Sequence, residues 1–429
     1  MSIDTLKQLL IDQRKNFLAK NNLIKRDLAE KNSDLIGSKQ IIVVTGVRRA
    51  GKSSLLKLLA GEILAKGVSA EQIFYVNFDD EFFVNFDKND FNNLLKAYWE
   101  IGETKKKVYC FFDEIQNVKY WEKWVNKLQE TGKFKIFVTG SNATLLSREI
   151  ATSLTGRNYP LEIFPFSFKE YLRYRKIDYS GHLTSDDGVV LKKELDKYLL
   201  SGGFPESVNS QLNILDEYYK NIIYKDIVAR YKIKEIDNFR ELAFYLFSNL
   251  TSPMTFRGLA TIFLEKKNEL SSMTVKKFIT YLENSYLLFQ VKKFEPAIKK
   301  QLVNPFKIYG VDNGMAGVVS FSISDNFGVF YENLVYLELR RKKNNQIFYF
   351  KDKFETDFVV KNKKELSLLQ VSYDLSNTKT LERENRGLKE AMNCLKQKEG
   401  LIINNYLDKT EKIDGGVIRY IPLWRWLLQ

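Results

Sequence analysis

Apolar runs alternate with helical patterns over the first part of the chain. Four runs are apolar on both faces of a strand: Gln40–Thr45, Ile73–Phe78, Lys107–Asp113 and Phe134–Thr139. This pattern is typical of parallel strands that helices cover on both sides, whereas a strand with one face in water alternates apolar and polar residues. The alternation of strands and helices therefore predicts an α/β domain with a parallel sheet over residues 1–165.

The spacing of apolar positions changes after this domain. Residues 166–235 have helical spacing and predict a helical region. Residues 236–315 contain three helical patterns followed by two strand-like runs, Leu287–Phe294 and Pro305–Gly310, which predicts a winged helix. Residues 316–429 again mix helical and strand patterns and predict a second α/β domain.

The composition is that of a globular protein and limits the possible chemistry. With 44% hydrophobic and 28% charged residues, the chain of 429 residues is neither disordered nor fibrous. No apolar run reaches the roughly 18 residues of a membrane span, and the N-terminus lacks the apolar core of a signal peptide. Two cysteines and one histidine leave no basis for a disulfide framework, a zinc site or Ser-His-Asp catalysis. We therefore expect a cytoplasmic protein without a membrane span.

Basic residues outnumber acidic ones, 67 Lys and Arg against 53 Asp and Glu, which gives a net charge of +14. Net charge of this sign favours a polyanionic partner, such as nucleic acid or an acidic membrane surface. A general bias towards lysine in the composition is the alternative explanation.

A phosphate-binding motif lies between the first strand and the helix that follows it. The segment GVRRAGKS, residues 46–53, matches G-x-x-x-x-G-K-[S/T], the P-loop. Its glycines let backbone N–H groups face phosphates at a helix N-terminus. Lys52 would reach the β- and γ-phosphates of ATP, and the Ser53 hydroxyl would bind Mg²⁺. The candidate nucleotide-binding residues are Gly46, Arg48, Arg49, Ala50, Gly51, Lys52, Ser53 and Ser54.

The third apolar strand ends in two acids, Asp113 and Glu114, as a Walker B motif does. Asp113 would hold Mg²⁺, and Glu114 would polarise the attacking water as general base. The pair favours ATP hydrolysis, because a switch GTPase would carry a guanine-reading N-K-x-D motif instead.

Polar residues follow the fourth strand. Either Ser141 or Asn142 could orient the attacking water, and either could simply cap the next helix. Arg157 lies near the expected edge of the domain and is a candidate arginine finger that acts on a neighbouring subunit. Capping of its own helix is the alternative role for Arg157.

The predicted winged helix carries many lysines. On its third helix, Lys276, Lys277 and Tyr281 lie opposite the apolar face. The strand region that follows contributes Lys292, Lys293, Lys299, Lys300 and Lys307 against one acid, Glu295. Lysines neutralise phosphates, whereas base-edge readers are sparse here, so we expect DNA binding that depends on structure and not on sequence. A winged helix that contacts protein is the alternative.

Several motifs resemble, in order, those of a known family. They are GVRRAGKSSLL, FFDEIQNVKYWEKWV, TGSNATLLS, LTGRNYPLEIFPFSFKEYL, SGGFPESV and YKDIVARYKI. The family is one of bacterial and archaeal AAA-type ATPases with a C-terminal domain of unknown function, related to the archaeal ATPase (MNS) clade near the STAND NTPases. The resemblance implies a P-loop ATPase core, a helical lid, a winged helix and a restriction-endonuclease-like domain. It also implies that Gly203 and Pro205 contact the nucleotide and that Arg26 lines the base.

Three C-terminal residues resemble the metal site of endonuclease-like domains. Glu332, Asp357 and Gln370 have the order of E…D…(E/Q)-x-K, in which carboxylates hold Mg²⁺ beside the scissile phosphate. Ser372 stands where the lysine is expected, so we expect a degenerate domain that does not cleave DNA. Other lysines could take over that role: Lys351, Lys353 and Lys361.

Together these observations predict an ATPase, with ATP and Mg²⁺ as cofactors, that couples hydrolysis to DNA binding or remodelling. We expect it to act as a homo-oligomeric ring, such as a hexamer, on branched or forked DNA. The alternative is a STAND-like switch, in which ATP binding gates oligomerisation and protein partners are the target.

Overall fold

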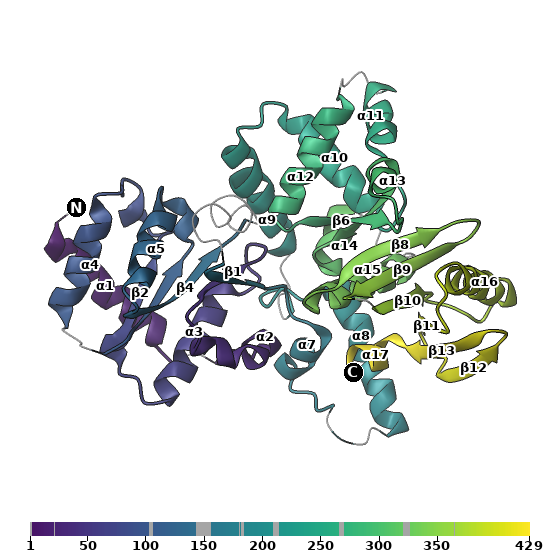
Figure 1. Cartoon of the computed structure of the whole chain (residues 1–429), viewed down its shortest axis with the longest axis horizontal. Coiled ribbons are helices and arrows are strands. Elements are labelled where there is room, and N and C mark those ends of the chain that lie inside the picture. The colour runs from purple at the N-terminus through teal and green to yellow at the C-terminus, as the bar shows by residue number, and fades with distance from the viewer. Residues whose placement is uncertain are drawn as a thin grey trace. The chain divides into compact units, whose positions relative to one another are not determined.

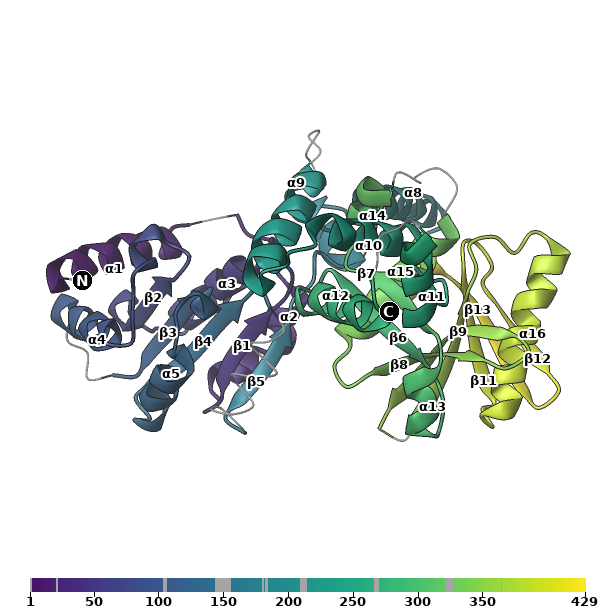
Figure 2. The same cartoon turned by 90° about the horizontal axis from the view of Figure 1, so that it is seen from above.

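The computed structural model describes residues 2–20, 22–102, 106–142, 156–179, 181, 184–208, 214–265, 270–320, 327–363 and 365–429 (Figures 1 and 2). The chain forms two compact units. The first contains residues 1–164 together with 284–286, and the second contains residues 165–283 and 287–429.

The first unit is built around a five-stranded parallel sheet with the order β2-β3-β4-β1-β5. The strands are β1 (Ile41–Thr45), β2 (Ile73–Asn77), β3 (Val108–Asp113), β4 (Phe134–Gly140) and β5 (Asn158–Glu162). The α/β class with a parallel sheet is confirmed, as are the four apolar strands. Strand β5 was not predicted from the sequence.

Helices cover both faces of this sheet (Figure 2). They are α1 (Ile3–Leu18), α2 (Asp27–Lys31), α3 (Lys52–Ala65), α4 (Asp90–Ile101) and α5 (Trp121–Glu130), with short 3₁₀ turns at Ser33–Ile36, Ala70–Gln72, Glu81–Phe83 and Ile115–Asn117. Side chains of α2 and α3 face Ile42 and Phe137, whereas α4 and α5 pack on the opposite face.

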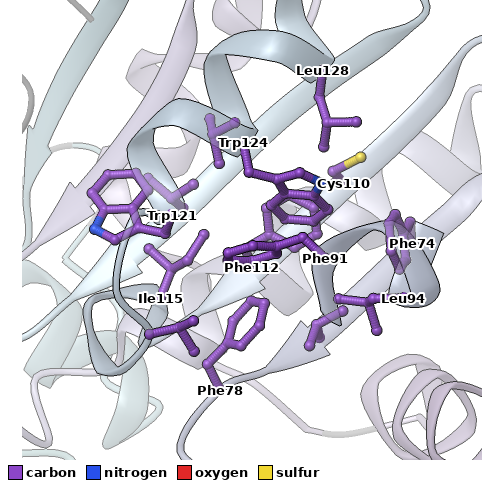
Figure 3. Close-up of a cluster of buried hydrophobic side chains, with 14 of the residues drawn as sticks. Phe74, Phe78, Phe91, Leu94, Cys110, Phe112, Ile115, Trp121, Trp124 and Leu128 are labelled. Atoms are coloured by element: carbon purple, nitrogen blue, oxygen red, sulfur yellow. The ribbon is translucent and has the colours of Figure 1, made fainter. Parts of the chain in front are cut away.

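Aromatic packing fixes the inner strand β3 in this core. The Phe112 ring lies 5.4 Å from the Phe74 ring and 4.9 Å from Trp124 on α5, between centroids. Trp124 in turn stacks on Phe91 of α4 at 4.5 Å (Figure 3). Truncation of such a ring to Ala costs about 3–5 kcal/mol. The core therefore holds in place the end of β3, where Asp113 is the last residue of the strand and Glu114 begins the next turn.

The helical part of the second unit begins after Phe164. Its helices are α7 (Phe168–Tyr174), α8 (Ser185–Ser201), α9 (Ile214–Asn221), the π-helical segment η6 (Ile222–Ala229), α10 (Ile236–Ser248), α11 (Phe256–Glu265) and α12 (Ser272–Asn284). On α12 the apolar positions expected from the sequence are buried: Val275, Phe278, Ile279 and Leu282. Lys276 and Lys277 are exposed on the other face, as expected.

The second unit also contains an eight-stranded mixed sheet with the order β12-β13-β11-β10-β9-β8-β6-β7. Its strands are β6 (Leu288–Lys293), β7 (Phe306–Gly310), β8 (Gln346–Lys351), β9 (Glu355–Asn362), β10 (Glu365–Val371), β11 (Glu399–Asn404), β12 (Lys409–Ile413) and β13 (Gly416–Pro422). The accompanying helices are α13 (Ile298–Val303), α14 (Asn313–Ser320), α15 (Phe327–Arg341), α16 (Thr378–Cys394) and α17 (Leu423–Leu427). Helix α16 packs on this sheet through Leu388, Ala391 and Met392 (Figure 1).

The structure differs from the expected boundary between residues 315 and 316. Strands β6 and β7, predicted as a separate wing, form an antiparallel pair, but β6 also pairs in parallel with β8 at Lys292–Phe348 and Lys293–Tyr349. They therefore belong to the C-terminal sheet. The apolar pattern identifies a strand but not the strand with which it pairs. Two antiparallel strands at the edge of a larger sheet therefore have the same sequence pattern as the two strands of a wing.

Within the described parts of the chain, no helix combines the length and the hydropathy that a membrane span requires.

Candidate nucleotide-binding site

The P-loop connects β1 to α3, where the sequence places it. Two of its glycines are required by the local geometry. A Cβ atom at Gly46 would lie 2.1 Å from the Ile163 carbonyl oxygen. Gly51 caps α3 with φ of 97°, in the left-handed region that favours glycine. The loop therefore depends on both glycines of the motif.

Lys52 lies inside this loop and is buried. Its ammonium donates to the carbonyl oxygens of Gly46, at 3.3 Å, and Val47, at 3.4 Å. It also forms an ion pair with Glu114, with 3.2 Å between Nζ and Oε1. The P-loop and the Walker B strand, which the sequence identified separately, thus meet at this ion pair.

Asp113 lies beside the P-loop at the end of β3. It accepts hydrogen bonds from the Ser53 hydroxyl and from Thr139 Oγ1, at 2.5 Å to Oδ1. Burial raises the pKa of Asp113, although these two bonds act in the opposite direction. A carboxylate and a hydroxyl are oxygen ligands of the kind that Mg²⁺ prefers. The residues present therefore fit a magnesium ion.

Glu114 has an unusual backbone, with φ of 49°. Its N–H donates to Thr139 Oγ1 at 2.9 Å, and its Oε2 accepts from Gln116 at 2.5 Å. Burial is the largest influence and alone would raise the pKa of Glu114, but the Lys52 ammonium, the Gln116 amide and Arg48 together lower it. The side chain is thus ionised at neutral pH, as a general base must be.

Thr139 is a site residue that the sequence reasoning missed. It bonds both acids: its hydroxyl donates to Asp113 and accepts from the Glu114 N–H. Ser141 and Asn142, the residues predicted to orient water, are both buried next to it in the chain, and that role stays a prediction. The sequence feature that could have identified Thr139 is its position at the end of the fourth apolar strand. The ends of neighbouring parallel strands lie at the same edge of the sheet, so their last side chains come together.

Arg26 contacts the P-loop backbone. Its guanidinium donates to the carbonyl oxygens of Ala50, at 2.9 Å, and Phe164, at 2.6 Å. Arg26 is buried, so it supports the loop, and contact with the base stays a prediction. The other arginines of the motif, Arg48 and Arg49, are half-buried and exposed, respectively, and Arg48 contributes to the lowered pKa of Glu114.

Arg157, the candidate arginine finger, lies at the opposite end of β1. Its carbonyl accepts from the N–H of Ile41, the first residue of β1. The P-loop follows Thr45, the last residue of β1. At roughly 3.3 Å per residue the strand separates the two ends by about 13 Å. The Arg157 guanidinium pairs with Glu130, at 2.8 Å. In its own chain Arg157 therefore does not reach the P-loop, and action on another subunit stays a prediction.

Gly203 and Pro205 belong to the second unit. Gly203 donates its N–H to Asp312 Oδ2 at 2.7 Å, and its carbonyl accepts from the Phe166 N–H at 2.6 Å. A Cβ atom at this position would lie 2.3 Å from the Phe166 carbonyl oxygen. Close packing thus explains the glycine, and nucleotide contact by Gly203 and Pro205 stays a prediction.

The fold and this site are those of a P-loop ATPase, and a family model described as an AAA domain matches residues 38–172. Two models described as domains of unknown function match residues 192–325 and 327–426. An uncharacterized protein of Methanocaldococcus jannaschii is 36% identical over 95% of this chain and 92% of its own length. An uncharacterized protein of Haemophilus influenzae is 30% identical over 97% of this chain and all of its own length.

The chain belongs to the family of these proteins, AAA-domain ATPases with C-terminal domains of unknown function, which confirms the resemblance seen in the sequence. Among solved structures, a Walker-type ATPase of Pyrococcus abyssi is 15% identical with a TM-score of 0.41, over 70% of this chain and 97% of that one.

Proposed function

We propose that this protein hydrolyses ATP. The observation that carries the proposal is the meeting of Lys52, Asp113 and Glu114 at one end of the sheet. Mg²⁺ held by Ser53 and Asp113 would supply positive charge to the phosphate oxygens. Lys52 binds the β- and γ-phosphates, and Glu114 takes the proton of the attacking water.

Lys52 has two tasks in this scheme, because its ammonium is paired with Glu114. When Lys52 turns to the phosphates, Glu114 loses a hydrogen-bond donor and becomes a stronger base. Thr139 keeps the Glu114 backbone in place during this change through its bond to the N–H. Substrate binding and activation of the base are thereby linked through one lysine.

We further propose that hydrolysis is coupled to binding or remodelling DNA by a ring of subunits in the cytoplasm. The net charge of +14 supports a polyanionic partner. Exposed lysines of the second unit would contact phosphates: Lys276, Lys277, Lys292, Lys299 and Lys300. Because Arg157 does not reach its own P-loop, a finger role would require the nucleotide of a neighbouring subunit.

A STAND-like switch acting on protein partners is the second candidate. The Lys52–Glu114 ion pair favours the switch, because an enzyme whose general base is paired with a lysine hydrolyses nucleotide slowly. Phosphate release by the purified protein, with and without forked DNA, separates the two functions. We expect forked DNA to raise the rate for the DNA-coupled ATPase, with Glu114→Gln as the inactive control. Slow turnover that DNA does not change would favour the switch.

A further inference from the structure

Three carboxylates of the second unit converge on one lysine. Lys307, on β7, is buried, with its side chain 1% exposed. Its Nζ lies 3.0 Å from Glu332 Oε1, 2.9 Å from Glu355 Oε1 and 3.2 Å from Asp357 Oδ1. The sequence grouped Lys307 with the exposed lysines that would contact DNA. That expectation was wrong for this residue, because burial removes it from any phosphate.

Other groups bind the same carboxylates. Tyr309 donates its hydroxyl to Glu332 Oε1 at 2.7 Å, and the Val371 N–H donates to Asp357 Oδ2 at 2.9 Å. Each of these carboxylates therefore already has at least one oxygen at hydrogen-bond distance from a donor, where a magnesium ion would need oxygens at about 2.0–2.1 Å.

Gln370, the third residue expected at a metal, has both polar atoms in use. Its Oε1 accepts from the Asp357 N–H at 3.2 Å, and its Nε2 donates to Glu384 at 2.6 Å. The amide oxygen thus faces the backbone of β9.

The electrostatics of the cluster agree with its geometry. Burial alone would lower the pKa of Lys307, but Glu332, Asp357 and Glu355 raise it above its ordinary value. Lys307 therefore carries its charge at neutral pH. Burial, and then the charge of Asp357, raise the pKa of Glu332 to about 7. Partial protonation of Glu332 at neutral pH thus reduces the negative charge that the one ammonium faces.

We propose that the ammonium of Lys307 occupies the position that the resemblance to endonuclease-like domains assigns to a divalent metal. The cluster is then an internal ion-pair network that ties β7 to α15 and β9. Because this ammonium already contacts an oxygen of each of the three carboxylates, it takes the place of the ion that the fold resemblance implies, so this part of the chain binds no Mg²⁺ and cleaves no DNA.

Metal binding by the full-length protein tests the proposal. The measurement is isothermal titration with Mn²⁺ in an Asp113→Asn background, without nucleotide, so that the P-loop site does not contribute. We expect no binding while Lys307 is present. The added change Lys307→Ala should lower the Kd for Mn²⁺ at least tenfold relative to the protein that keeps Lys307. Lys307→Arg, which keeps the positive charge, should not lower it. A folded Lys307→Ala variant that binds no Mn²⁺ would overturn the proposal.

The protein that retains Lys307 tests the proposal even if the Lys307→Ala variant does not fold. Absence of Mn²⁺ binding and of metal-dependent nicking of linear and branched DNA supports the proposal. Binding or nicking that Asp357→Asn abolishes would overturn it and make the cluster a working metal site.

Discussion

The Lys52 ammonium lies 3.2 Å from the Glu114 carboxylate. The residue expected to bind phosphate is therefore paired with the residue expected to activate water. Because each holds the other, a change to either one alters the position of its partner, and loss of the Lys52 ammonium also raises the pKa of Glu114.

The first prediction separates binding from hydrolysis. Lys52→Ala should abolish nucleotide binding, because the loop loses its charge for the phosphates. Glu114→Gln should keep binding but lower kcat by about 10²–10⁴-fold, the usual contribution of a general base. Equilibrium binding of a fluorescent ATP analogue and steady-state phosphate release measure the two effects. Normal turnover by Glu114→Gln would show that another residue activates the water.

Thr139 is expected to act as a positioning residue for both acids. Thr139→Val keeps the shape but removes the hydroxyl that bonds Asp113 and the Glu114 N–H, so we expect kcat to fall roughly tenfold with KM little changed. Thr139→Ser restores the hydroxyl and should restore most of the rate. Equal losses in the Val and Ser variants would mean that packing, and not the hydroxyl, matters.

Arg157 is predicted to act across a subunit interface. Arg157→Ala should lose ATPase activity, and mixing it with the Glu114→Gln protein should restore part of it, because some interfaces then contain both intact residues. Glu130→Gln is the matched control: it breaks the same exposed ion pair, which is worth at most about 1 kcal/mol, but keeps the arginine. No recovery at any mixing ratio would leave Arg157 with a structural role.

Lysines of α12 and β6 are predicted to contact DNA phosphates: Lys276, Lys277 and Lys292 are exposed, and Lys293 is half-buried. Replacing Lys276, Lys277, Lys292 and Lys293 with Glu should weaken binding and flatten its salt dependence. Each lost contact removes about 0.9 from the log–log slope on duplex DNA. Fluorescence anisotropy over a salt series measures this slope. The control is a variant with four Lys→Glu changes at other exposed lysines: Lys361, Lys396, Lys398 and Lys412. Equal effects of the two variants on the salt slope would show that only the net charge of the protein matters.

The sequence predicted those parts of the molecule that local pattern determines. The apolar runs of β1 to β4 and the P-loop spacing need no knowledge of distant residues. Strand β5 was missed because its sequence, NYPLE, has little apolar character and contains Pro160, which a strand at the edge of a sheet tolerates.

Contacts between distant segments could not be predicted. Thr139 and Lys307 are ordinary residues in the sequence, and only the folded chain brings them to their carboxylates. The basic stretch around Lys307 even indicated the opposite environment, because composition reports charge and not burial.

The pairing of β6 with β8 has a practical consequence for dividing this protein into fragments. A fragment that starts at residue 327, where the last family match begins, lacks β6 and β7 and leaves β8 as an unprotected edge strand. Such edges invite pairing between molecules and aggregation. The same cut removes Lys307 and leaves its three acids without their shared cation. The two C-terminal matches are thus one folding unit, and a stable fragment has to start upstream of β6.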